Sequence, residues 1–102
     1  MDSFPEIIPT ERLKPDDVPR PEEPWRKLSR FALTFDPVEA RDYGAAAGDL
    51  SRASSRLSLA ELRAHLYVEQ RRWNHFGDEP DASTMRKLRE IVRLIHAKLQ
   101  PD

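Results

Sequence analysis

The chain contains no cysteine, so it has no disulfide framework and no thiolate that could bind a metal or act as a nucleophile. It has only three glycines among 102 residues, and they do not form the glycine-rich patterns that bind phosphates or dinucleotides. Neither a Gly-x-Ser-x-Gly turn nor a His-Glu-x-x-His helix motif is present. We therefore expect a protein that is not an enzyme and that holds neither a metal nor a cofactor.

Long apolar runs are also missing, and no stretch is apolar enough to span a bilayer. Residues 1–5 lack the basic region and the apolar segment of a secretory signal. We therefore expect a cytoplasmic protein that does not enter a membrane. Arginine far outnumbers lysine, and alanine and proline are common, as is typical of a GC-rich bacterial genome.

Prolines are concentrated at the start of the chain, where residues 1–24 hold six of the nine. Because proline interrupts helices and the middle of sheets, we expect an extended or disordered arm over residues 1–24, followed by a single helical domain over residues 25–102. The arm has a net charge of −4, against +2 for residues 25–56 and +1 for residues 57–102. Its few apolar residues leave open whether it packs across the helices or becomes ordered on a partner. We expect the helical body to fold without residues 1–20.

The clearest helix start lies just before residue 59. Ser58 and Glu61 have the spacing of a capping box, in which each side chain accepts a hydrogen bond from the other residue's backbone N–H. Leu57 and Leu62 occupy the positions of a hydrophobic staple. Together these signals predict a helix from Leu59 to about Phe76.

This helix has apolar residues on two nearly opposite faces, which is typical of a helix at the centre of a bundle. One face holds Leu59, Leu62, Leu66, Trp73 and Phe76, and the other holds Ala60, Ala64, Tyr67 and Val68. A polar strip of Glu61, His65, Glu69 and Arg72 lies between them. We interpret His65 as an ion-paired surface histidine, because His65 and Glu69 alone do not make a metal site.

A second helix is predicted after the break Gly77–Asp81, with Asp81 as its cap and Pro101 as its stop. Its apolar stripe consists of Met85, Leu88, Ile91, Val92, Ile95 and Leu99. A short break between two long amphipathic helices favours an antiparallel hairpin.

The middle of the chain is less clearly patterned. Residues 25–35 suit a helix entered through Pro24, although residues 31–35 also alternate as a strand would. We favour the helix, because a lone strand has no partner. Asp36 and Pro37 then start a helix that is expected to reach about Ser55. The predicted fold is all-α, a small bundle of three to four helices with a C-terminal hairpin and an extended proline-rich arm.

Four basic residues form a strip along the last predicted helix: Arg86, Arg89, Arg93 and His96. The guanidinium group of arginine binds carboxylates and phosphates through paired hydrogen bonds, so this strip suits an acidic protein, RNA or DNA. The competing interpretation is an ordinary solvated face, because every surface helix needs a polar side.

A second candidate group is Arg72 and Trp73, with Tyr67 nearby on the same helix. Arginine, tryptophan and tyrosine dominate the centres of protein interfaces, so an exposed edge here would anchor a partner. Helical spacing instead favours a core position for Trp73.

From these features we predict a small non-catalytic protein-binding module or an accessory or regulatory subunit, comparable to antitoxins, immunity proteins or adaptors. Its partner is expected to be another protein, and a homodimer is a further alternative. The alternative function is a nucleic-acid-binding regulator that uses the basic strip on the last helix.

Overall fold

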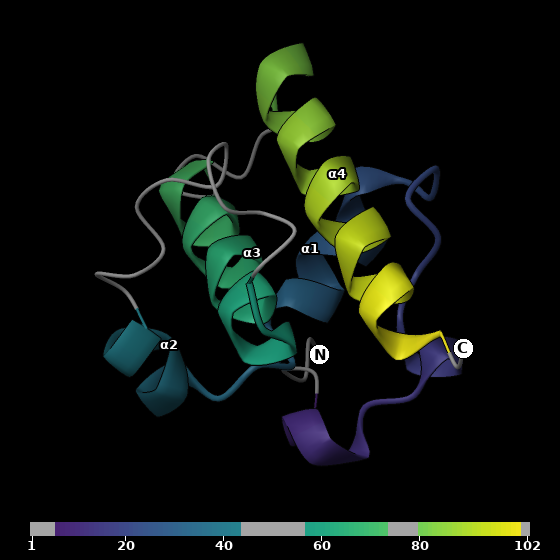
Figure 1. Cartoon of the computed structure of the whole chain (residues 1–102). Helices are drawn as coiled ribbons and strands as arrows, with labels where there is room; N and C mark the ends of the chain where they lie inside the picture. Colours follow the sequence, from purple (N-terminus) through teal and green to yellow (C-terminus); the bar gives the residue numbers. More distant parts are fainter. Residues whose placement is uncertain (1–5, 44–56, 74–79, 101–102) are drawn as a thin grey trace.

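The computed structural model describes residues 6–43, 57–73 and 80–100 (Figure 1). These residues form four α-helices and no strand, as the all-α prediction required. The helices are α1 (Trp25–Ala32), α2 (Pro37–Tyr43), α3 (Leu59–Trp73) and α4 (Ala82–Leu99). Two short 3-10 turns, η1 (Thr10–Arg12) and η2 (Pro15–Asp17), precede them. Within these ranges, no helix is both long enough and apolar enough to cross a membrane.

Helix α3 begins with the predicted capping box. The backbone N–H of Glu61 donates to Ser58 Oγ at 3.1 Å, and the N–H of Ser58 donates to Glu61 Oε1 at 3.0 Å. The hydrogen bond from the Ser58 N–H also lowers the pKa of the Glu61 carboxyl. Leu57 and Leu62 are both buried in the same apolar cluster, as the staple predicts.

Helix α4 begins at the predicted cap, where Asp81 Oδ1 accepts a 2.7 Å hydrogen bond from the Thr84 N–H. That bond lowers the pKa of the Asp81 carboxyl. The predicted stripe is buried at Met85, Leu88, Ile91, Val92 and Ile95. Helices α3 and α4 lie side by side and run in opposite directions, which confirms the hairpin (Figure 1). The predicted turn and stop residues, Gly77 and Pro101, lie outside the described residues.

Helix α3 is the central element and contacts all three other helices. Its Leu62 and Leu66 face belongs to a large cluster shared with α1, α4 and the arm. Its Ala64 and Tyr67 face belongs to a smaller cluster shared with Phe35 and α2. The prediction of a helix that is apolar on two sides is therefore confirmed.

Residues 25–32 form a helix, and residues 33–35 form a turn rather than a strand. Helix α1 ends at Ala32, and residues 33–35 turn away from it with Thr34 Oγ1 donating to the Phe31 carbonyl at 2.6 Å. Asp36 then accepts the Val38 N–H at 2.9 Å and opens α2. The predicted continuation of this helix to Ser55 lies outside the described residues.

The arm packs against the helices over residues 6–24, so the structure favours one of the two options that the sequence left open. Leu13 and Val18 are buried in the large cluster, at 7% and 5% exposure. The Ile8 N–H donates to the Thr34 carbonyl at 2.9 Å. The backbone is extended between η1 and η2, as proline-rich sequence dictates, but its apolar side chains form part of the core.

Candidate functional site

The residues predicted to bind a partner fall in three separate places. Arg86, Arg89 and Arg93 line a groove formed by the arm, α1 and α4. Tyr67 and Arg72 line a second groove, between α2 and α3. His96 lies in neither of these grooves, and the side chain of Trp73 lies outside what the structure describes.

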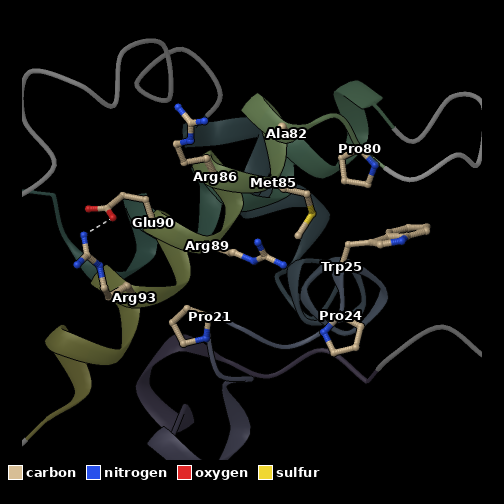
Figure 2. Close-up of a pocket in the computed structure, with 10 residues that line it drawn as sticks. All are labelled: Pro21, Pro24, Trp25, Pro80, Ala82, Met85, Arg86, Arg89, Glu90 and Arg93. Carbon is tan, nitrogen blue, oxygen red and sulfur yellow. Dashed lines mark hydrogen bonds and ion pairs between the residues drawn. The ribbon is translucent and has the colours of Figure 1, made fainter.

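The first hollow, which we call the α1–α4 groove, is open and has a volume of about 780 Å³ (Figure 2). Its lining is Pro21, Pro24, Trp25, Pro80, Ala82, Met85, Arg86, Arg89, Glu90 and Arg93. The arm supplies the first two prolines, and the start of α1 supplies the tryptophan. The rest comes from α4, between Ala82 and Arg93, and from Pro80, which lies two residues before that helix.

Local sequence explains how each wall of the α1–α4 groove is placed. Pro24 is the N-cap of α1, so Trp25 is the first residue of that helix. The arm residues just before the groove are held against the helices, because Val18 is buried and the Pro19 carbonyl lies 2.9 Å from His96 Nε2. Met85 is buried at the edge of the apolar stripe of α4, so it forms an apolar floor next to the arginines.

The arginines of this groove differ in their pairing. Arg93 forms an ion pair with Glu90, one turn earlier on the same helix. Arg86 and Arg89 are exposed, and neither has a hydrogen bond or ion pair within the described part of the chain. In Figure 2 the guanidinium of Arg89 extends into the hollow, whereas that of Arg86 points outward from α4.

The predicted basic strip is therefore not a continuous free surface. His96 is half-buried, and its ring donates to the arm through the Pro19 carbonyl when Nε2 carries the proton. Arg93 is neutralised by Glu90. Two of the four predicted residues, Arg86 and Arg89, keep a guanidinium available to a ligand.

The second hollow, the α2–α3 groove, has a volume of about 650 Å³. Its lining is Pro37, Ala40, Arg41, Tyr67, Val68, Arg71 and Arg72. Tyr67 is buried to 8% exposure, and Arg71 lies over its ring at 5.9 Å from the centroid. Arg72 pairs with Glu69 at 3.4 Å, so this predicted residue is partly neutralised.

Sequence reasoning missed the polar residues of α3 that become buried. Arg63 is 1% exposed, and its guanidinium donates to the Ile8 carbonyl at 2.7 Å and to Thr34 Oγ1 at 3.0 Å. Burial lowers the pKa of Arg63, and the charge of Glu39 opposes that shift. The available signal was the pair of apolar faces on α3, because a helix enclosed on two sides leaves few exposed positions between them.

The surface assignment of His65 was wrong. Its side chain is 4% exposed, and its Nε2 has no hydrogen-bond partner among the described residues. Burial lowers the pKa of the ring, and the carboxylates of Glu61 and Glu69 oppose this only in part. Glu69 itself pairs with Lys87 of α4 at 3.3 Å, so packing against α4 encloses this side of α3.

The described residues contain no group of three His, Asp or Glu side chains placed to hold a metal ion. Both grooves present guanidinium groups beside apolar surface. Comparison with protein-family models, with curated protein sequences and with solved structures gives no match for this chain.

Proposed function

We propose that this protein is a non-catalytic protein-binding module, an accessory or regulatory subunit of the antitoxin, immunity or adaptor kind. Its α1–α4 groove takes an acidic segment of the partner. The observation that carries this proposal is that Arg86 and Arg89 stand exposed and unpaired, within the described residues, beside the buried side chain of Met85. A carboxylate of the partner would bind the guanidinium groups while a neighbouring apolar side chain covers the methionine.

The prolines of the groove support recognition of a partner chain. Pro21, Pro24 and Pro80 each have a fixed backbone φ and no N–H group. A wall of this kind loses little conformational entropy when a partner binds, so more of the contact energy appears as affinity.

Charge favours a protein partner over a nucleic acid. The net charge of the chain is −1, and Glu90 neutralises one of the three arginines that line the groove. Non-specific binding to DNA or RNA depends on several cations that together displace counterions from the phosphates. Two free guanidinium groups beside an apolar floor fit a short acidic peptide better.

The test uses a capped synthetic peptide in which one leucine is flanked on both sides by glutamate and aspartate. Addition of the peptide should shift the amide NMR signals of Ala82, Met85 and Arg89. In the double variant Arg86→Gln, Arg89→Gln, affinity should fall by roughly 5-fold per arginine, since a net charge-assisted contact is worth about 1 kcal/mol or more. Lys98→Gln is the matched control, because Lys98 is exposed on the same helix and lines neither groove.

Unchanged affinity in the double variant would reject the α1–α4 groove as the binding site. Random single-stranded RNA and duplex DNA are titrated in parallel over a range of salt concentrations. Tight and steeply salt-dependent binding to either one, lost in the same variant, would establish the nucleic-acid alternative in place of the protein-binding function.

We further propose that the protein acts in the bacterial cytoplasm, either as a monomer or as a homodimer. The excess of arginine over lysine and the frequent alanine and proline are typical of a GC-rich bacterial genome and support a bacterial source. Fractionation of the host cell tests the location, and light scattering over a concentration series tests the oligomeric state.

A further inference from the structure

The α2–α3 groove shares no lining residue with the α1–α4 groove, and the proposed function does not use it. We propose that it is a second docking site for an acidic protein segment, so that one molecule can hold two such segments at once. The use of both grooves together rests on the proposed function of the first groove. Docking at the second groove rests on its own residues alone.

The charge of the α2–α3 groove is of one sign. Arg41, Arg71 and Arg72 line it, and no carboxylate is among the described lining residues. Arg41 is exposed and has no ion pair or hydrogen bond with the described part of the chain. An acidic segment is the occupant that complements this lining.

The guanidinium of Arg71 is held in position before any ligand arrives. It lies over the Tyr67 ring, and its Nη1 donates to the Tyr67 hydroxyl at 3.5 Å. Because Tyr67 is 8% exposed and packs against Ala40, the ring is itself fixed by the smaller apolar cluster. A stacked arginine loses less side-chain freedom when it binds a carboxylate, so the contact is stronger than one from a free arginine.

The floor of this groove offers apolar contact beside the charge. Ala40 from α2 and Val68 from α3 line it, with Pro37 at the start of α2. An acidic segment with one aliphatic or aromatic side chain would therefore place that side chain between the two helices and its carboxylates against the arginines. The ligand has the same chemical character as the one proposed for the α1–α4 groove.

Helix α3 separates the two grooves. Its Leu62 and Leu66 face packs toward α1 and α4, whose residues line the first groove, and its Ala64 and Tyr67 face packs toward α2. In Figure 1, α2 and α4 lie on opposite sides of α3. Two ligands would therefore not compete. A partner with two linked acidic segments would bind more tightly than either segment alone, because binding of one segment raises the local concentration of the other.

The experiment titrates the leucine-containing acidic peptide into the full chain and follows amide NMR signals in both grooves. We expect two peptides to bind, with one set of shifts at Ala82 and Met85 and another at Ala40 and Val68. The variant Arg41→Gln, Arg71→Gln should lose roughly 5-fold or more affinity at the second set alone. Arg30→Gln is the control, because Arg30 is an exposed arginine of α1 that lines neither groove.

A single peptide bound at the α1–α4 groove, with no shifts at Ala40 and Val68, would reject the second site and leave the proposed function standing. Shifts at Ala40 and Val68 alone would support the second site and reject the first. Because Arg71 contacts a buried tyrosine, the single variant Arg41→Glu is included as a substitution that removes no described contact. If this charge reversal leaves peptide affinity at Ala40 and Val68 unchanged, the second site is rejected.

Discussion

Replacing Arg63 by methionine removes the guanidinium that fastens the arm to the helices. Its Nη1 donates to the Ile8 carbonyl at 2.7 Å and to Thr10 Oγ1 at 3.1 Å, and its Nη2 donates to Thr34 Oγ1 at 3.0 Å. The group also lies 5.0 Å from the centroid of the Phe35 ring. One side chain of α3 thus holds both the arm and the turn that follows α1.

The expected loss of stability follows from three hydrogen bonds with a charged donor. Each is worth about 1.5 to 3 kcal/mol, so their loss costs roughly 4.5 to 9 kcal/mol in total. Methionine fills most of the same space and carries no charge, so it avoids the cost of burying a guanidinium. The lowered pKa of Arg63 reflects that cost, because burial disfavours its charged form. After this offset we expect Arg63→Met to lower the free energy of unfolding by about 3 to 5 kcal/mol.

The assay is chemical denaturation, with amide hydrogen exchange at Ile8 as a local readout. Exchange at Ile8 should speed up in Arg63→Met, because its N–H is bonded to the Thr34 carbonyl only while the arm stays in place. Arg30→Met is the control, since an exposed arginine should change stability by about 0.5 kcal/mol or less. Equal stability of the two variants would refute the claim that Arg63 anchors the arm.

The remaining predictions concern the core and the buried His65. Burial lowers the pKa of His65 in the folded state, so the unfolded state binds a proton more readily. Protonation of His65 should therefore leave the free energy of unfolding unchanged well above its ordinary pKa of 6.5 and reduce it as the pH drops below that value. In urea titrations across this pH range, His65→Gln should flatten that fall relative to the unchanged protein; equal slopes in the two proteins would contradict the prediction. Leu13→Ala should cost about 2 to 5 kcal/mol in thermal or chemical unfolding, as should Leu88→Ala, since both side chains are buried in the large cluster. A neutral Leu13→Ala would support the expectation that the body folds without residues 1–20.

The features that local sequence specifies were predicted well. The caps at Ser58 and Asp81 depend on residues within three positions of each other, so their hydrogen bonds follow from spacing alone. The buried stripe of α4 and the two apolar faces of α3 follow from helical periodicity in the same way. These signals were enough for the fold class and the hairpin.

The features that depend on distant parts of the chain were not predicted. The burial of His65 depends on how α4 packs beside α3, where Lys87 pairs with Glu69. The α1–α4 groove requires Pro21 of the arm to lie near Arg89, although the two are far apart in sequence. Proline content predicted an extended or disordered arm, but it did not indicate that Leu13 and Val18 are part of the core.

The packing of the arm bears on the order in which the chain gains its structure during synthesis. The His96 ring contacts the Pro19 carbonyl across 77 residues, and Arg63 reaches the Ile8 carbonyl across 55. The arm leaves the ribosome well before α4, so its apolar side chains have no complete site until the last helix is made. Contacts of such long sequence separation slow folding, because the loop must close before they form. A nascent chain stalled before α4 would therefore expose Leu13 and Val18 to chaperones and proteases, while the finished protein conceals them.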